Sequence, residues 1–255
     1  MRLIKVEKMK TSNNTVLITG GSAGIGFEIA QQLSEQGNQL IITGRNAERL
    51  QAAAARLKNT TAIVSDVSSE SDVHKLVKQL NEAFPQLNVV INNAGYSSSP
   101  YRLLPGVDTF EKASAEIQTN YLSVLRLNEL LLPLLNKQAQ AAIVNVSSIV
   151  SFAPSIDIPG YSISKAALHA YSRVLRITLK DTPVRVFELM PPLVNTEFSK
   201  EIGGEKGIPP SQVAADLIDG LKNDVYEIHV GGTADIYQLY LSSPENALQA
   251  LNSNK

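Results

Sequence analysis

Short runs of aliphatic and β-branched residues alternate with amphipathic stretches along most of this chain. Seven of the runs are typical of buried strands, because each is short and rich in valine, isoleucine or threonine. They cover residues 15–19, 39–43, 60–64, 89–91, 142–146, 184–189 and 226–230. Between them, apolar residues recur every three or four positions, as on one face of a helix. The predicted helices cover about residues 25–37, 47–57, 70–84, 108–136, 161–179 and 211–221.

This alternation predicts an α/β protein with a single-domain, Rossmann-type, doubly wound parallel sheet of about seven strands and helices on both faces. We expect residues 1–14 to form a disordered or frayed lead-in, 15–232 the domain, and 233–255 a partly helical tail. The sequence contains no internal repeat, low-complexity tract or interdomain linker. Ligands of such sheets bind at the carboxyl ends of the strands, so the turns that follow the strands are the candidate site.

Composition and charge argue against several classes of partner. The net charge of −1 gives no sign of the positive surface that binds nucleic acid. The chain has no cysteine, which excludes disulfides and thiolate ligands, and its three scattered histidines give no reason to expect a metal site. No apolar run approaches the ~20 residues of a membrane span, and residues 1–14 lack the apolar segment of a signal peptide. We therefore expect a cytoplasmic protein that binds small molecules.

A glycine-rich turn follows the first predicted strand directly and leads into the first predicted helix. Its glycines are Gly20, Gly24 and Gly26, in the spacing G-x-x-x-G-x-G. Glycines let the backbone approach a pyrophosphate, and the free amides at a helix N-terminus can bind it. A tight turn without a ligand is the alternative. The order strand, glycine turn, helix favours nucleotide binding.

The turn after the second predicted strand bears on which nucleotide is bound. In dinucleotide-binding folds an acid at this place binds the free ribose 2′-hydroxyl, whereas an arginine accommodates a 2′-phosphate. Here the residues are Gly44, Arg45 and Asn46, with no acid among them. A solvated loop arginine is the alternative, but the position relative to the glycine turn favours the 2′-phosphate of NADP(H).

Three further polar positions need an explanation. Asp66, after the third strand, suits the adenine amino group, although it could instead cap the next helix. Residues 92–95, Asn-Asn-Ala-Gly, suit close approach of a ligand to the backbone, or form a simple turn. Asn120 lies in the middle of a predicted helix, where asparagine is unfavourable because its side chain competes for backbone hydrogen bonds.

Tyr161 and Lys165 form a candidate proton-transfer pair, because residues four apart lie one turn apart on one helical face. A nearby ammonium lowers the pKa of a phenol from its usual value of ~10. Such a tyrosine can exchange a proton with a carbonyl or alcohol oxygen near neutral pH. A core tyrosine beside a surface lysine is the alternative for the isolated pair.

Taken together, these motifs resemble the short-chain dehydrogenase/reductase superfamily over about residues 15–230. The order and spacing of the glycine turn, the Asn-Asn-Ala-Gly turn, Asn120, Ser148 and the Tyr161/Lys165 pair all agree with that family. Ser148 lies 13 residues before Tyr161, as in the family, so Ser148 and not Ser147 is the catalytic candidate. Residues 187–197 and 224–230 further resemble the DltE-type oxidoreductases. One departure is Pro192, where the family usually has glycine.

The resemblance implies hydride transfer between the nicotinamide of NADP(H) and a carbonyl carbon. It implies that Tyr161 exchanges the proton, Ser148 holds the carbonyl oxygen, Lys165 binds the nicotinamide ribose and lowers the Tyr161 pKa, and Asn120 holds a water that links Lys165 to solvent. The residues expected at the cofactor are Gly20, Ser22, Gly24, Ile25, Gly26, Arg45, Asn46, Asp66, Val67, Asn93, Ala94, Gly95, Tyr161, Lys165, Pro191, Val194 and Thr196.

We therefore expect an NADPH-dependent carbonyl reductase or secondary alcohol dehydrogenase that acts on a small ketone, aldehyde or alcohol. A nucleotide-binding regulator or scaffold without turnover is the alternative from another class. Reduction of a substrate on acyl carrier protein would need a basic docking patch, and Arg102, Lys200 and Lys206 are too scattered to predict one. The long apolar helices 108–136 and 161–179 predict a homodimer or homotetramer.

Overall fold

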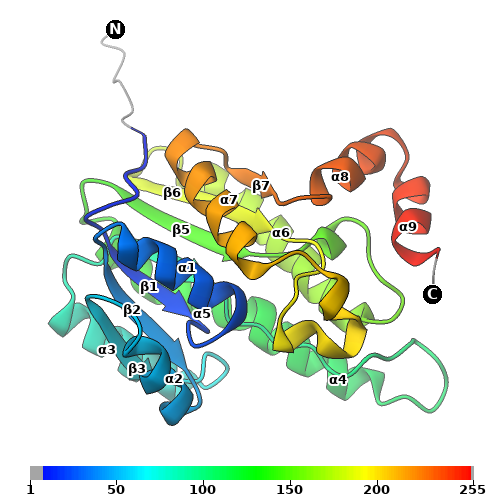
Figure 1. Cartoon of the computed structure of the whole chain (residues 1–255), viewed down its shortest axis with the longest axis horizontal. Helices are drawn as coiled ribbons and strands as arrows, with labels where there is room; N and C mark the ends of the chain where they lie inside the picture. The colour runs from blue at the N-terminus through cyan, green and yellow to red at the C-terminus, as the bar shows by residue number, and fades with distance from the viewer. Residues whose placement is uncertain (1–7, 254–255) are drawn as a thin grey trace, which may run out of the picture.

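The computed structural model describes residues 8–253 and contains a seven-stranded sheet in which all neighbouring strands are parallel. The strand order is β3-β2-β1-β4-β5-β6-β7, with helices on both faces (Figure 1), so the predicted fold class is confirmed. The strands are β1 Thr15–Thr19, β2 Gln39–Gly44, β3 Thr60–Val64, β4 Val89–Asn92, β5 Ala141–Val146, β6 Val184–Met190 and β7 Glu227–His229. Because β1 pairs with both β2 and β4, the strand order reverses there, and a crevice opens at such a switch point.

Two apolar layers hold the helices on the sheet. The α-helices are α1 Gly24–Glu35, α2 Ala47–Ala54, α3 Glu70–Ala83, α4 Thr109–Ile117, α5 Ser123–Leu135, α6 Pro159–Thr178, α7 Pro210–Asn223, α8 Thr233–Ser242 and α9 Pro244–Asn252. Leu33 of α1 and Leu217 of α7 pack on one face of the sheet, and Leu80 of α3 and Leu131 of α5 pack on the other. Of the helices within residues 8–253, none is both long enough and apolar enough to span a bilayer.

The single helix expected over residues 108–136 is wrong in one detail. A π-helical turn, η1 (Gln118–Leu122), separates α4 from α5, and the Ser123 N–H donates to the Gln118 carbonyl five residues earlier. π-turns inside helices are rare and occur frequently at functional sites. This one contains Asn120, whose side chain is fully buried.

Both ends of the described chain contact the rest of the domain. Residues 1–7 of the expected lead-in lie outside the described residues, and Met9 is only 3% exposed and belongs to the core. The tail forms α8 and α9. These pack on the loop between β5 and α6, where the Phe152 ring lies 5.1 Å from that of Tyr237 and Asn252 accepts from the Ile156 N–H.

Candidate active site

A cleft of about 450 Å³ lies along the carboxyl ends of the strands, from the turn after β1 to the start of α6. The predicted cofactor residues that line it are Gly20, Ser22, Gly24, Ile25, Arg45, Asn46, Asp66, Val67, Asn93, Ala94, Gly95, Tyr161, Lys165, Pro191 and Thr196. Gly26 and Val194 are not among the lining residues. The fold thus brings turns that are far apart in sequence to one crevice.

The glycine turn has a geometry that other residues could not adopt without strain. Gly20 and Gly24 have positive φ angles of 66° and 52°. Gly26 has a different role, because a Cβ added there would lie 2.4 Å from both the Gly20 carbonyl oxygen and Asn93 Nδ2. Gly26 therefore permits the close packing that shapes the turn, although it does not itself line the cleft.

Asn93 connects the glycine turn to the end of β4. Its Nδ2 donates to the carbonyls of Thr19, at 3.0 Å, and Gly20, at 3.1 Å. The Thr19 hydroxyl accepts from the backbone amides of Asn93 and Ala94, both at 3.0 Å. Sequence reasoning missed Thr19, although a hydroxyl at a strand end beside the glycine turn is a usable signal. These bonds fix the floor of the cleft.

At the far end of the cleft, two predicted residues also have structural roles. Asn46 caps α2 by accepting from the Arg49 N–H at 2.8 Å, and Asp66 accepts from the Ser68 N–H at 2.9 Å. Asp66 does not cap α3, because Ser69 does so. Each nevertheless remains on the wall of the cleft beside Arg45.

The polar groups of this region fit a dinucleotide. Thr43 Oγ1 and Ser65 Oγ are buried in the cleft wall, and neither has a hydrogen-bond partner within the described part of the chain. Buried polar groups are normally hydrogen-bonded, so a polar ligand in the cleft would satisfy them. Arg49, which sequence reasoning missed, also lines the cleft and forms an exposed ion pair with Glu197 of η3 (Glu197–Ile202) at 2.7 Å.

Tyr161 and Lys165 line the inner end of the cleft, and Ser148 lies beside Tyr161 without being one of the lining residues. Tyr161 lies in the first turn of α6, and Lys165 lies one turn later, 4% exposed, with Nζ donating to the Val146 carbonyl at 2.8 Å. The Lys165 Nζ is 5.5 Å from the centre of the Tyr161 ring. Ser148 follows β5 and is hydrogen-bonded to the Tyr161 phenol. The predicted trio is therefore assembled.

The expected lowering of the Tyr161 pKa by Lys165 is wrong for this structure. Burial raises the pKa of Tyr161, and the hydrogen bond from Ser148 acts in the opposite direction without outweighing it. Burial also lowers the pKa of Lys165 to about 8, against the attraction of Glu188. The spacing of Tyr161 and Lys165 in sequence did not show how deeply the two groups are buried. The raised pKa keeps the phenol protonated at neutral pH.

The neighbouring serines have different surroundings. The Ser147 hydroxyl donates to Glu188 Oε1 at 2.5 Å and is buried. Ser148, not Ser147, is bonded to the Tyr161 phenol. Ser147 lines the cleft and Ser148 does not, so the assignment of the substrate oxygen to Ser148 stays a prediction.

Asn120 uses its side chain to hold the loop after β4. Its Nδ2 donates to the Tyr96 carbonyl at 2.8 Å and to Ser164 Oγ at 2.9 Å, and its Oδ1 accepts from the Tyr96 N–H at 2.8 Å. The asparagine thus binds the backbone of Tyr96 as a neighbouring strand would, which explains its place inside a helical segment. The predicted contact with a water stays a prediction.

Most of the chain is similar to one enzyme family. Residues 14–207 match the family model described as short chain dehydrogenase. The chain therefore belongs to the short-chain dehydrogenase/reductase superfamily, whose members are oxidoreductases. The uncharacterized oxidoreductase DltE of Bacillus subtilis is 39% identical over 225 residues, covering 86% of this chain and 89% of that protein. The predicted likeness to DltE-type oxidoreductases is thereby confirmed.

Two solved structures share the fold. A short-chain dehydrogenase/reductase from Burkholderia phymatum, in complex with NAD, has a TM-score of 0.82 at 17% identity and covers 92% of each chain. Pseudomonas aeruginosa RhlG, in a complex with NADP, has a TM-score of 0.77 at 28% identity, covering 84% of this chain and 91% of that one. Because one holds NAD and the other NADP, the choice of nucleotide depends on the residues of each chain.

Proposed function

We propose that this oxidoreductase is an NADPH-dependent carbonyl reductase that also oxidises secondary alcohols in the reverse direction. The observation that carries the proposal is the position of the Tyr161 phenol, which is bonded to Ser148 and lies beside Lys165 at the inner end of the cleft. Proton transfer to an oxygen needs an acid at the end of the cleft where the substrate meets the nicotinamide.

Ser148, Tyr161 and Lys165 have different roles in the proposed reduction. A bound nicotinamide supplies the hydride. The Ser148 hydroxyl holds the carbonyl oxygen and stabilises the charge that develops there. Tyr161 donates its proton to the same oxygen, and the Lys165 ammonium offsets the negative charge left on the phenolate. In alcohol oxidation the Tyr161 oxygen accepts the proton instead.

Preference for NADPH rests on the residues after β2. Arg45 and Arg49 both line the cleft, and residues 44–46 contain no acid that would repel a phosphate. Arginine can bind a phosphate through charge-assisted hydrogen bonds. Because each such bond contributes about 1.5–3 kcal/mol, one contact gives a preference of roughly ten- to a hundredfold. Arg45 is the residue that we expect to contribute most.

The substrate side of the cleft favours a small neutral carbonyl compound. The ring of Phe198, at the start of η3, lies 5.9 Å from that of Tyr161 and is half exposed at the cleft wall. An apolar ring beside the acid suits a ketone or aldehyde with an apolar substituent. A cluster of arginines or lysines for a charged substrate is not found among the residues that line this inner end.

We further propose that the protein is a homodimer or homotetramer. Several large apolar side chains on α4, η1 and α6 are exposed, namely Phe110, Leu122, Ile163, Val174 and Ile177. Because α4 and η1 both contact α6, these side chains lie on neighbouring elements, which supports an interaction surface there. Adjacent helices on one side of the molecule can form a self-complementary interface around a two-fold axis.

A screen of NADPH oxidation against neutral ketones and aldehydes tests the proposed activity. The decrease in NADPH absorbance should depend on both substrate and enzyme for at least one compound of the panel. If the protein binds NADPH but oxidises it with no member of the panel, the alternative of a nucleotide-binding regulator without turnover is favoured.

A further inference from the structure

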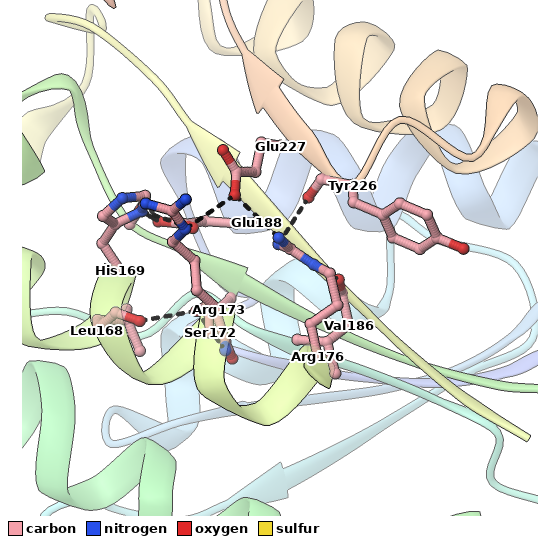
Figure 2. Close-up of polar contacts among 11 residues, drawn as sticks. Leu168, His169, Ser172, Arg173, Arg176, Val186, Glu188, Tyr226 and Glu227 are labelled. Atoms are coloured by element: carbon pink, nitrogen blue, oxygen red, sulfur yellow. Dashed lines mark hydrogen bonds and ion pairs between the residues drawn. The ribbon is translucent and has the colours of Figure 1, made fainter. Parts of the chain in front are cut away.

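A fully buried carboxylate lies behind the active site, on the face of β6 that meets α6. Glu188 is 0% exposed, and its Oε1 accepts from the Ser147 hydroxyl at 2.5 Å. The His169 Nδ1 lies 2.9 Å from Oε2 and 3.0 Å from Oε1 of the same carboxylate, as Figure 2 shows. A buried carboxylate is costly unless it is hydrogen-bonded and paired, so a reason for its presence is worth seeking.

The partners of Glu188 are neighbours of the residues that hold Lys165. His169 follows Lys165 by one turn of α6, so the two side chains lie on one helical face. Ser147 follows Val146, whose carbonyl accepts from the Lys165 ammonium at 2.8 Å. Glu188 therefore connects α6 to the end of β5, and Lys165 is held between these two segments.

A second carboxylate, farther out, serves different groups. Glu227 of β7 bonds Arg176 at 2.9 Å and lies 3.6 Å from Arg173, both on α6 (Figure 2). Together these arginines hold the pKa of Glu227 below its ordinary value, although burial alone would raise it. Glu227 is thus paired with two arginines, whereas Glu188 is bonded to His169 and Ser147, next to the segments that hold Lys165.

We propose that Glu188 is a positioning residue for catalysis, whose buried charge, held by Ser147 and His169, keeps Lys165 protonated beside Tyr161. This inference rests on the proposed function, because a charged Lys165 matters for proton transfer by Tyr161. The attraction of Glu188 opposes the lowering of the Lys165 pKa by burial, which supports the same conclusion. The titratable and charged groups around these side chains are Tyr161, Lys165, His169, Arg173 and Arg176 of α6, Glu116 of α4, Glu188 of β6, and Glu227 and His229 of β7.

A direct test measures the titration of Lys165 by NMR in protein labelled with [ε-¹³C]lysine, with the signal assigned by its loss in Lys165→Arg. In Glu188→Gln, which removes the charge but keeps the shape, the Lys165 pKa should fall by about one unit, as for loss of a nearby opposite charge. The matched control Glu227→Gln removes a charge of the same kind from the same network, and should leave the Lys165 pKa nearly unchanged. An unchanged Lys165 pKa in Glu188→Gln, or an equal fall in both variants, would overturn the proposal.

Activity gives a second readout. In carbonyl reduction, the loss of kcat/KM as pH rises should occur about one pH unit lower in Glu188→Gln than in wild type, because the Lys165 ammonium loses its proton more readily. If no substrate is found, the proposed function fails while the NMR titration still decides the inference. Should Glu188→Gln not fold, the double variant Glu188→Met/His169→Leu removes the pair without leaving a buried charge. In this double variant the Lys165 pKa should fall by the same amount as in Glu188→Gln. An unchanged Lys165 pKa would equally contradict the role of Glu188.

Discussion

Replacing Lys165 by methionine should make the protein more stable while it removes a group that we propose takes part in catalysis. Burial holds the pKa of Lys165 at about 8, against an ordinary value of 10.5, a difference of 2.5 units. At about 1.4 kcal/mol per unit, keeping this ammonium charged at pH 7 costs roughly 3 kcal/mol of folding free energy, a balance that already includes the attraction of Glu188. Loss of the hydrogen bond to Val146 offsets about 1 kcal/mol, so the net gain is roughly 2 kcal/mol.

The pH dependence separates this explanation from ordinary repacking. The pKa of Lys165 is lower in the folded state, so between pH 8 and 10.5 the unfolded chain binds more protons and wild-type stability rises with pH. The advantage of Lys165→Met should therefore be largest at pH 7 and should shrink towards pH 9.5. Above about pH 10.5, where Lys165 is neutral in both the folded and the unfolded state, the buried ammonium no longer contributes to the difference in stability.

Urea unfolding at pH 7, 8, 9 and 9.5 provides the assay. Lys180→Met is the control, because Lys180 is an exposed lysine just beyond the end of the same helix, and it should match wild type at every pH. A Lys165→Met variant that is less stable than wild type at pH 7, or whose advantage does not change with pH, would show that the reasoning about the buried ammonium is wrong.

Three further predictions concern the cleft and the assembly. Gly26→Ala should lower the free energy of unfolding by about 1–3 kcal/mol and weaken NADPH binding, because the new methyl group would lie 2.4 Å from two atoms. Urea unfolding measures the stability and fluorescence titration measures the binding of NADPH. Unchanged values of both would refute the packing role of Gly26. Gly44→Asp combined with Arg45→Ala should reverse the preference for NADPH over NADH in kcat/KM, whereas comparable efficiency with both cofactors in wild type would contradict the role given to this turn. Light scattering at micromolar concentration should give the mass of a dimer or tetramer, and a monomeric mass would refute the proposed interface.

The fold was predictable because its signals are local. Each strand is a short run rich in β-branched residues, and a buried parallel strand requires little more. The glycine turn and the Asn-Asn-Ala-Gly turn each follow a strand, so parallel topology alone brings them to one edge of the sheet. The same rule placed Arg45 and Asp66 at the cleft, which is where they lie.

The features that the sequence did not predict depend on contacts between residues that are distant in sequence. The Ser147 hydroxyl reaches Glu188 across 41 positions, and Arg49 reaches Glu197 across 148, and neither contact has a pattern in the sequence. A helical period cannot distinguish the π-turn around Asn120 from an uninterrupted helix. The spacing of Tyr161 and Lys165 showed that they are neighbours, but the direction of their pKa shifts follows from burial, which only the packed structure shows.

The role of Tyr161 as the proton donor is tested most directly by Tyr161→Phe, which removes only the phenolic oxygen. With a ketone that wild type reduces, the NADPH-dependent turnover should fall by about 10²–10⁴-fold, the contribution typical of a positioned general acid, while the Kd for NADPH stays near the wild-type value. Turnover within about tenfold of wild type, measured in the same assay with NADPH binding intact, would contradict the assignment of Tyr161 and with it the proposed mechanism.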